Sequence, residues 1–377
     1  MFIPFNKPHL TGKELHYIYE AVYSGKISGN GEFTKKCQVF FEQKYGFRKC
    51  LLTTSCTDAL EMAALLMNIG SDDEVIVPAY TFVSTANAFV LRGAKIVFSD
   101  SCPNHPNIDA DQLEQLISPK TKAIVVVHYG GMACDMDKIM EIASKYQLIV
   151  VEDAAQAIDA HYKKQPLGSI GHLASFSFHE TKNIISGEGG MLAINDQQFV
   201  ERAEIIWEKG TNRSAFFRGE VNKYEWVDVG SSFLPSDVTA AFLYAQLENI
   251  EEIQAKRIQI WDWYRQGLRP LEEQGKIQLP QIPKHAETNG NIFYLMCQSK
   301  QERDTLIQHL RGAEIHAVFH YLSLHKSPFY QDKHDGRDLA YCDHFADCIV
   351  RLPLYYDLSK GDIDRIVKEI QRFYANR

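Results

Sequence analysis

The sequence lacks the features that mark membrane, fibrous and nucleic-acid-binding proteins. No stretch of the 377 residues comes near the roughly 18 uninterrupted apolar residues that a membrane-spanning helix needs. No block of like charges, internal repeat or low-complexity tract occurs. With a net charge of −8 and a pI of about 6.0, the chain is not expected to bind a nucleic acid or an anionic membrane as its main partner. The first residues, MFIPFNKPHL, have neither a basic start nor a long apolar run, and we expect a cytoplasmic protein.

The cysteines show no pattern typical of a disulfide framework or a zinc site. Eight are scattered along the chain without a CxxC pair, at positions 37, 50, 56, 102, 134, 297, 342 and 348. Scattered thiols in a long chain indicate reduced cytosolic residues, so we expect neither disulfide bonds nor a bound metal. A GxGxxG sequence after a strand is also missing, which disfavours a dinucleotide-dependent dehydrogenase.

What the sequence does contain is a regular alternation of short apolar runs with helical patterns. The apolar runs predict strands at 50–55, 74–79, 95–100, 123–129, 148–155, 174–180 and 190–196. Between the first two, CTDALEMAALLMNIG repeats apolar residues at helical spacing. Nearly continuous apolar strands separated by helices indicate a mostly parallel sheet that is covered on both faces.

The pattern changes after about residue 245. A long helical pattern at 237–271 is followed by strand-like 291–297, a helical stretch RDTLIQHLRGAE, strand-like 315–322 and an amphipathic helix near 361–375. We therefore expect a large α/β domain over residues 1–250 and a small C-terminal α+β domain over residues 251–377.

Two chemically distinctive side chains follow predicted strands. Asp153 and Gln156 lie at the end of the buried strand in VVEDAAQA, where ligands of open α/β sheets bind. The stretch FSFHETKNIISGEGGM, which begins at Phe176, places Lys182 between a strand and a glycine-rich loop. Such a lysine is a candidate nucleophile, although a lone lysine after a strand is more often a solvated surface residue.

A helix start and an aromatic pair are two further candidate features of a site. TTSCTDAL places Ser55, Cys56 and Thr57 at a strand-to-helix turn, where free backbone N–H groups favour a phosphate. YTFVST places Tyr80 and Phe82 at another strand end. Each feature alone has an ordinary structural explanation, such as helix capping or core packing. Together, an anion cradle, an aromatic ring, a buried acid and a lysine describe a pocket for pyridoxal phosphate (PLP), whose aldehyde reacts with a neutral amine and whose ring nitrogen pairs with an acid.

The chain resembles a known enzyme family over nearly its whole length. The matching stretches are SGKISGNGEFTKKCQVFFEQKYG, SCTDALEMAALL, DEVIVPAYTFVSTANAFVLRGAKIVFSD, VHYGGMACDMD, VEDAAQA, SFSFHETKN with GEGG, and RLPLYYDLS. As a set they resemble the sugar-nucleotide aminotransferases of the DegT/DnrJ/EryC/StrS family. The resemblance implies the PLP-dependent transferase fold type I (aspartate aminotransferase-like), L-glutamate as amino donor, and a homodimer with active sites between its subunits.

The family's functional residues can be matched position by position. The resemblance implies that Lys182 is the catalytic Schiff-base lysine, Asp153 the partner of the pyridine nitrogen and Phe82 the stacking aromatic. It further implies that Gln156 lies near the ring hydroxyl and that Ser177, Cys56 and Thr57 hold the phosphate. One departure concerns an Asn that reaches the phosphate from the second subunit in many members; here Leu234 stands in its place, with Ser231 and Ser232 as neighbours.

The substrate is expected to be a nucleotide-linked keto sugar. FSFHETKN, EKGTNRSAFFRGEVNKYEWVDVGSS and AVFHYLSLH resemble the subgroup that aminates C4 of dTDP-4-dehydro-6-deoxy-D-glucose for surface polysaccharide. We expect Arg213 and Arg218 to pair with a diphosphate and His320, Tyr321 and His325 to line the sugar pocket.

Three alternatives remain open at the level of sequence. A 3-keto sugar aminotransferase would differ only in how the sugar is turned in the pocket. A PLP-dependent sugar 3-dehydratase carries a histidine in place of the lysine, so Lys182 argues against it. A non-catalytic regulator with the same fold and a ligand-sensing pocket is the third, and the presence of both Lys182 and Asp153 disfavours it.

Overall fold

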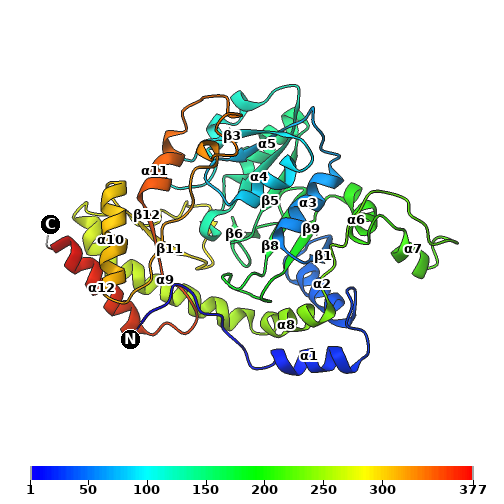
Figure 1. The fold of residues 1–377 in the computed structure, drawn as a ribbon, viewed down its shortest axis with the longest axis horizontal. Coiled ribbons are helices and arrows are strands. Elements are labelled where there is room, and N and C mark those ends of the chain that lie inside the picture. The colour runs from blue at the N-terminus through cyan, green and yellow to red at the C-terminus, as the bar shows by residue number, and fades with distance from the viewer. Residues whose placement is uncertain (1, 376–377) are drawn as a thin grey trace.

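A seven-stranded sheet forms the centre of the molecule in the computed structural model, which describes residues 2–375 (Figure 1). Its strands follow the order β1-β9-β8-β5-β4-β2-β3. Their bounds are β1 Lys49–Thr53, β2 Glu74–Pro78, β3 Lys95–Ser99, β4 Thr121–Val127, β5 Ile149–Asp153, β8 Leu173–Ser177 and β9 Gly190–Ile194. Only β9 runs antiparallel to its neighbours, β1 and β8, while the remaining pairs are parallel. The mostly parallel sheet expected from the apolar runs is confirmed.

Helices cover both faces of this sheet, because its central strands are apolar on both sides. In β4, every residue except Lys122 is buried. One face packs against α2 (Glu32–Tyr45), α5 (Met136–Tyr146) and α8 (Asp237–Leu247). The other packs against α3 (Cys56–Leu66), α4 (Val83–Val90) and α6 (Val200–Trp207). The two hydrophobic cores fix the strand ends, and the strand ends in turn position the site.

Two further helices lie at the margin of the large sheet domain. α1 (Glu14–Tyr23) packs along α8 below the sheet, and α7 (Arg213–Phe217) lies on an extended loop at the far right of the molecule (Figure 1). None of the helices within residues 2–375 is both long and apolar enough to span a lipid bilayer. The eight cysteines are all free thiols.

The single long helix expected at 237–271 is two helices in the structure. α8 ends at Leu247 and α9 begins at Ile250 and continues to Glu273. Between them the Asn249 side chain donates a hydrogen bond of 2.9 Å to the Ala245 carbonyl, near the end of α8. Such a side-chain bond competes with the helical backbone pattern and ends the helix.

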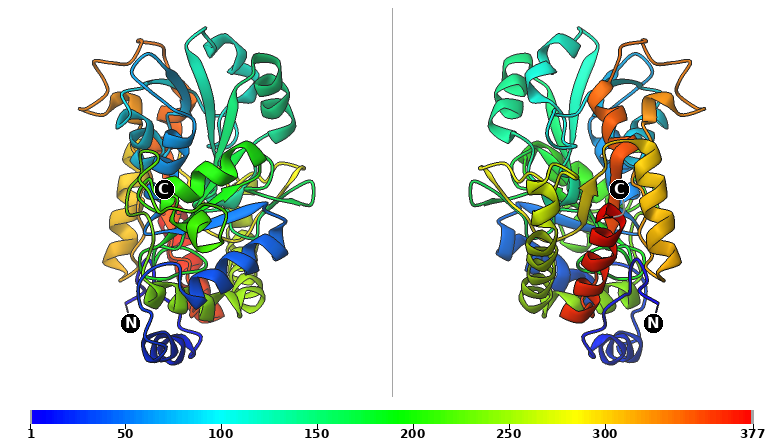
Figure 2. Two further views of the ribbon diagram at one scale, coloured as in Figure 1. Left: turned by 90° about the vertical axis from the view of Figure 1, so that its right-hand side faces the viewer. Right: turned by 90° about the vertical axis from the view of Figure 1, so that its left-hand side faces the viewer.

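The C-terminal part has its own small sheet and core. β11 (Phe293–Met296) pairs antiparallel with β12 (Ile349–Leu352). α9, α10 (Lys300–Gly312) and α12 (Lys360–Ala375) pack beside one another against it, and α11 (Ala340–Cys348) leads into β12 (Figures 1 and 2). Ile3 joins this core from the N-terminal end of the chain and pairs with Ile315.

A third, minor sheet connects the two parts. It has the order β10-β6-β7, with bounds β6 His161–Tyr162, β7 Gln165–Pro166 and β10 Ala286–Glu287. The strand β6 follows the end of β5, and β10 lies just before the small domain begins its own sheet. Through this pairing, the segment just before the small sheet contacts the segment that follows Asp153.

The strand expected at 315–322 is not formed. The segment makes single bridges, Ile315 with Ile3 and Val318 with Arg351, and then leaves the small sheet. Tyr80 donates its hydroxyl hydrogen to the His320 carbonyl, so the segment is bound to the large domain instead of to a neighbouring strand. His320 and Tyr321 therefore lie next to the carboxyl ends of the strands of the large sheet.

Candidate active site

A cavity of about 550 Å³ opens at the carboxyl ends of β4, β5 and β8. Parallel sheets with helices on both faces usually bind their ligands at this edge. The lining contains nine of the twelve predicted site residues, which are Cys56, Thr57, Phe82, Asp153, Gln156, Ser177, Lys182, His320 and Tyr321.

Lys182 is held in a compact turn between β8 and β9. Its backbone N–H donates to the His179 carbonyl at 2.9 Å. The next residue, Asn183, is buried, and its side chain donates to Gln254 Oε1 at 2.7 Å and to the Asn289 carbonyl at 2.9 Å. A buried and fully paired amide next to the lysine fixes the turn, so that the amine enters the cavity in a defined position.

The environment of the Lys182 amine favours its neutral form. Burial lowers the pKa of Lys182, against the opposing effect of nearby Cys56 and Asp153 and with the support of the Arg351 charge. A larger fraction of the amine is therefore unprotonated than in an exposed lysine. This is the form that reacts as a nucleophile or accepts a proton.

Asp153 is the last residue of β5 and is buried against the cavity wall. Thr85 donates its hydroxyl to Asp153 Oδ2 at 2.7 Å, and the Ala155 N–H donates to Oδ1 at 3.1 Å. Burial raises the pKa of Asp153, while the Thr85 hydrogen bond partly offsets the rise. A cationic N–H group beside the carboxylate would stabilise its charged form, as the partner of a pyridine nitrogen requires.

The start of α3 forms an open cradle of backbone N–H groups. Ser55 caps the helix by accepting from the Asp58 N–H at 3.1 Å, and Cys56 and Thr57 form the first turn. A Cβ atom on Gly190 would lie 2.4 Å from the Cys56 backbone nitrogen, so only glycine lets β9 pass this close. The helix dipole and its free N–H groups suit a phosphate at this position.

An exposed aromatic ring lies across the cavity from these groups. Phe82 leaves 56% of its surface exposed although it lines a cavity inside the molecule. Its ring centroid is 6.1 Å from that of Tyr321. A large apolar ring that is exposed at a cavity indicates a ligand-stacking surface rather than core packing.

Two residues of the 315–322 segment, His320 and Tyr321, form one side of the cavity. Tyr321 accepts a hydrogen bond of 3.1 Å from Gln156 Nε2, and Gln156 Oε1 accepts from the Gly130 N–H at 2.6 Å. His320 Nδ1 lies 2.9 Å from the Tyr129 hydroxyl. Burial, together with the Arg351 and Lys182 charges, lowers the pKa of His320, so its imidazole is neutral.

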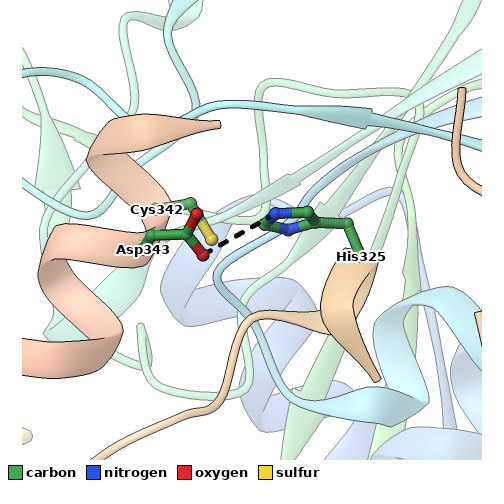
Figure 3. A group of neighbouring side chains, drawn as sticks. All are labelled: His325, Cys342 and Asp343. Carbon is green, nitrogen blue, oxygen red and sulfur yellow. Dashed lines mark ion pairs between the residues drawn. The ribbon is translucent and has the colours of Figure 1, made fainter. Parts of the chain in front are cut away.

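Three predicted residues lie outside this cavity. His325 lies in a buried group with Cys342 and Asp343, with its Nε2 3.6 Å from Asp343 Oδ1 (Figure 3). The Lys326 amine is 2.7 Å from the same carboxylate, so Asp343 already has a cationic partner. This group is separate from the cavity that contains Lys182.

Arg213 and Arg218 line a second cavity of about 710 Å³, at the margin near α7. Arg218 pairs with Glu204 at 2.9 Å and with Glu220 at 2.7 Å. Other lining residues of this second cavity include Lys26, Lys35, Lys49, Lys209, Ser232 and Leu234. Within one chain, the structure does not bring these two arginines to Lys182.

Arg351 is a cavity residue that the sequence reasoning missed. It lies in β12 and lines the first cavity. A single arginine in the apolar run CIVRLPLYY was the available signal, because a charged residue in a buried strand needs a special reason.

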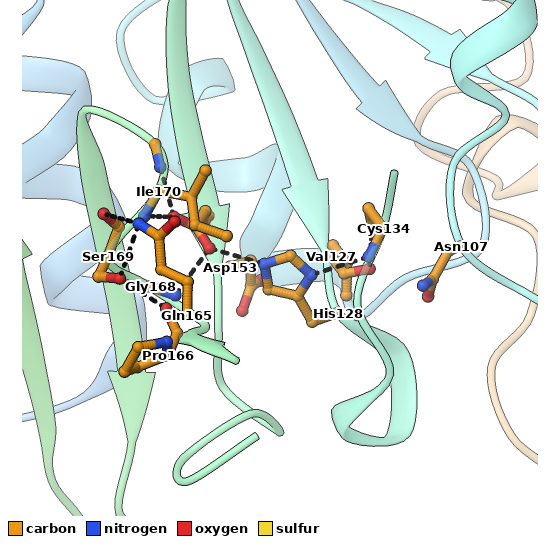
Figure 4. Close-up of polar contacts among 12 residues, drawn as sticks. Asn107, Val127, His128, Cys134, Asp153, Gln165, Pro166, Gly168, Ser169 and Ile170 are labelled. Carbon is orange, nitrogen blue, oxygen red and sulfur yellow. Dashed lines mark hydrogen bonds and ion pairs between the residues drawn. The ribbon is translucent and has the colours of Figure 1, made fainter. Parts of the chain in front are cut away.

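A buried hydrogen-bonded pair, His128 and Glu152, was also missed. His128 Nε2 lies 2.8 Å from Glu152 Oε2, and the same carboxylate accepts from the Gly168 N–H at 2.7 Å and the Ile170 N–H at 2.8 Å. His128 Nδ1 accepts from the Cys134 N–H (Figure 4), so the ring proton is on Nε2, the nitrogen that contacts Glu152. The signals were a histidine and a glutamate at the ends of neighbouring apolar strands.

Hydrogen bonding keeps this buried carboxylate charged. Burial by itself would raise the pKa of Glu152, but the hydrogen bonds from His128 and from the backbone N–H groups outweigh it and leave the pKa lowered. The network joins the ends of β4 and β5 to the 168–171 loop. It therefore supports the backbone from which Asp153 projects.

Comparison with known proteins shows which family the chain belongs to. Residues 8–371 match the model of the DegT/DnrJ/EryC1/StrS aminotransferase family. The chain belongs to this family. GDP-perosamine synthase of Caulobacter vibrioides is 33% identical to the chain, over 97% of this chain and 96% of that protein. The spore coat polysaccharide biosynthesis protein SpsC of Bacillus subtilis is 31% identical, over 98% of this chain and 96% of that protein.

A solved structure agrees with the fold. The PLP form of Spr1654 from Streptococcus pneumoniae superposes with a TM-score of 0.91 at 26% identity, over 100% of this chain and 99% of that chain. Fold type I, the enzyme class and the cofactor expected from the sequence are confirmed: the protein is a PLP-dependent sugar aminotransferase.

The residues of the first cavity fit pyridoxal phosphate. Gly190 leaves the start of α3 open for a phosphate, and Phe82 offers an exposed ring face. Asp153 is oriented by Thr85 and Ala155, with burial that favours a cationic partner. Lys182 supplies an amine of lowered pKa. These four features together match the phosphate, the ring and the aldehyde of the cofactor.

Proposed function

We propose that the protein transfers an amino group from L-glutamate to C4 of dTDP-4-dehydro-6-deoxy-D-glucose, giving dTDP-4-amino-4,6-dideoxy-D-galactose and 2-oxoglutarate. The observation that carries the proposal is the single cavity that joins Lys182, Asp153, Phe82 and the start of α3 to the 315–322 segment. The choice of the sugar rests on the resemblance of FSFHETKN and AVFHYLSLH to one subgroup of the family. A product of this kind is a building block for surface polysaccharide.

The chain's own residues have distinct tasks in this reaction. Bound PLP supplies an aldehyde for the amines and a ring that accepts electrons. The Lys182 Nζ would take a proton from the donor's Cα and deliver it within the same cavity. Asp153 holds the charge of the ring nitrogen, and the first turn of α3 holds the phosphate. Phe82 and Tyr321 keep water away from the reacting atoms.

The sugar is proposed to lie beneath the 315–322 segment. His320 and Tyr321 line the cavity, and both are connected by hydrogen bonds to residues of the large domain, Tyr129 and Gln156. Because His320 is neutral, it can donate or accept a hydrogen bond with a sugar hydroxyl without adding charge.

The nucleotide diphosphate is proposed to bind Arg213 and Arg218 across a homodimer interface. Large apolar side chains are exposed on α1, where Leu15 and Tyr23 are 80% and 82% exposed. At the end of α7 and in the loop after it, Phe217 and Trp226 are 72% and 82% exposed. Apolar surface of this extent is typical of an interface. In the proposed homodimer, the α7 loop of a second copy lies at the first cavity.

A cytoplasmic location completes the proposal. The nucleotide sugars and PLP are cytosolic compounds in this scheme, and all eight cysteines are free thiols, as in proteins of reducing compartments.

The test is a product analysis with the purified, PLP-loaded protein. Glutamate is supplied with dTDP-4-dehydro-6-deoxyglucose, with the GDP-linked 4-keto-6-deoxy sugar, or with a 3-keto isomer, and the product is solved by NMR. The proposal requires a 4-amino product with the galactose configuration from the dTDP sugar. A 3-amino product, or turnover of only the GDP-linked sugar, would replace the proposed substrate. A visible cofactor band that glutamate does not change would indicate the non-catalytic regulator.

A further inference from the structure

Two buried threonine hydroxyls lie in line with the Asp153 carboxylate. The Thr85 hydroxyl is 2.7 Å from Asp153 Oδ2, and the Thr81 hydroxyl is 2.8 Å from that of Thr85. All three residues are buried, and Thr81 also lines the first cavity. Thr81 lies just before α4 and Thr85 in its first turn, so the start of this helix holds both hydroxyls in place.

Each hydroxyl hydrogen has a defined direction when Asp153 is ionised. A carboxylate only accepts hydrogen bonds, so Thr85 donates its hydrogen to Oδ2. Because Thr85 has no second hydroxyl hydrogen, its oxygen accepts from Thr81. Both O–H groups then point toward the carboxylate, and a hydroxyl that accepts a hydrogen bond is itself a stronger donor. The Ala155 N–H, 3.1 Å from Oδ1, is the second donor to the carboxylate.

Asp153 needs this support because its surroundings oppose its charge. Burial raises the pKa of Asp153, and the Thr85 hydrogen bond is the largest of the effects that lower it. The titratable side chains that face the carboxyl group are Lys182, His128, Cys56 and Tyr321. A hydrogen bond to the charged form of a buried carboxyl group favours that form. Loss of the Thr85 hydroxyl should therefore favour a neutral Asp153.

We propose that Thr81 and Thr85 are positioning residues that hold Asp153 ionised and oriented toward the ring nitrogen of the cofactor. Thr85 acts on the carboxylate directly, and Thr81 acts through Thr85. The inference rests on Asp153 as the partner of the ring nitrogen in bound PLP. A ring nitrogen that keeps its proton lets the ring accept electrons, so the two hydroxyls support the chemistry through the carboxylate.

A second buried threonine–aspartate pair provides a matched control. Thr34 donates its hydroxyl hydrogen to Asp237 Oδ1 at 2.8 Å, and both residues are buried. Neither of them lines the first cavity. Replacing Thr34 with valine therefore removes the same kind of hydrogen bond from a buried carboxylate outside the cofactor site.

The experiment observes the ring nitrogen itself. The protein is loaded with PLP that carries ¹⁵N in the ring, and the ¹⁵N NMR signal distinguishes a protonated from an unprotonated nitrogen. Thr85→Val should move the signal toward the unprotonated position and weaken PLP binding about tenfold in an absorbance titration. Thr34→Val should change neither the signal nor the PLP affinity, although denaturation should show a similar loss of stability in both variants.

A double-mutant cycle distinguishes a relay from two independent contacts. Thr81→Val should move the NMR signal in the same direction as Thr85→Val but by a smaller amount. Because Thr81 acts only through Thr85, the double variant should match Thr85→Val alone. Thr85→Ser keeps the hydroxyl and should retain the wild-type signal, with PLP affinity within about threefold of wild type.

Three results would overturn the proposal: an unchanged NMR signal in Thr85→Val, equal changes in Thr85→Val and Thr34→Val, or additive effects of the Thr81 and Thr85 substitutions. Asp153→Asn is the reference for a side chain that cannot carry the charge, and its signal should move furthest. A signal that stays in place in Asp153→Asn would refute the pairing of Asp153 with the ring nitrogen. Neither readout requires a sugar or an amino donor, so a failure of the proposed substrate and a failure of the threonine relay are distinguishable.

Discussion

The two large cavities of the molecule are built in opposite ways. The first, around Lys182, is bounded by buried strand ends and a helix start, and most of its polar groups have a short hydrogen bond to a neighbour. The second, near α7, is bounded by exposed lysines and arginines, several of which pair with surface glutamates. The first cavity is lined by residues at the ends of strands and helices that pack in the two cores of the sheet. The second is lined by long charged side chains from α2, β1, α6 and α7.

This difference shows which of the two cavities is formed by a single chain without a ligand or a second subunit. A partly buried lysine, a buried acid and a helix start are positioned by backbone and side-chain hydrogen bonds within the chain. Exposed charges at a margin define a ligand site only when a ligand or a second subunit orders them. We therefore expect substitutions in the first cavity to affect the reaction itself and substitutions in the second to affect nucleotide affinity alone.

The largest effect is expected from Lys182→Ala. Removing the amine removes both the nucleophile and the proton carrier, so turnover should fall by at least about 10³-fold. Lys35→Ala, in the second cavity, is the matched control and should cost less than about tenfold. An undiminished rate in Lys182→Ala would refute the assignment and the contrast between the cavities.

Gly190→Ala tests the cradle at α3. The added Cβ would lie 2.4 Å from the Cys56 backbone nitrogen, so β9 or α3 must shift. We expect a cost of about 1–3 kcal/mol, seen as roughly 10- to 100-fold weaker PLP binding in an absorbance titration. Gly312→Ala in α10, where a Cβ meets no atom within 4 Å, should leave PLP affinity unchanged. Normal PLP binding by Gly190→Ala would place the phosphate elsewhere.

Glu152→Gln tests the support beneath Asp153. The substitution removes a buried carboxylate that accepts three hydrogen bonds or more, so the free energy of unfolding at pH 7 should fall by about 2–4 kcal/mol. Exposed Glu114→Gln should cost less than about 0.5 kcal/mol.

The same variant has a defined pH dependence. The folded-state pKa of Glu152 is lowered, so its stabilisation is present above the pKa of an unfolded glutamate, about 4.3, and is lost as the pH falls below it. Denaturation curves should therefore show wild type and Glu152→Gln converging in acid. A difference that is constant from pH 7 to pH 3 would contradict the charged state of Glu152.

The smallest effect is expected from Arg218→Ala. Its guanidinium is nearly half exposed and already pairs with Glu204 and Glu220. Loss of one such charge should weaken nucleotide-sugar binding by about three- to tenfold without changing the donor stage. Calorimetry with dTDP measures this. Unchanged binding would remove Arg218 from the nucleotide site.

The first cavity could be predicted from sequence because its residues lie at the ends of easily recognised elements. Asp153 ends an apolar strand, and Cys56 and Thr57 begin a helix behind a serine cap. Parallel strands bring such ends to one edge of the sheet whatever lies between them in the chain. Lys182 was found in the same way, from the strand that precedes it.

The rest of the site depends on contacts between distant segments. Arg351 lies in a four-residue strand whose partner is β11, 53 positions earlier at the nearest pair, Met296 and Ile349. The 315–322 segment reads as a strand, but its backbone is bonded to Tyr80 of the large domain. The break at Asn249 depends on one side-chain hydrogen bond, which an apolar pattern does not encode.

The central claim is that Lys182 carries the cofactor at the edge of the sheet. The direct measurement is reduction of the PLP-loaded protein with borohydride, followed by digestion and mass spectrometry of every lysine-containing peptide. The account predicts one pyridoxyl group, on Lys182. A label on any other lysine, or none in a protein that still binds PLP, would contradict it.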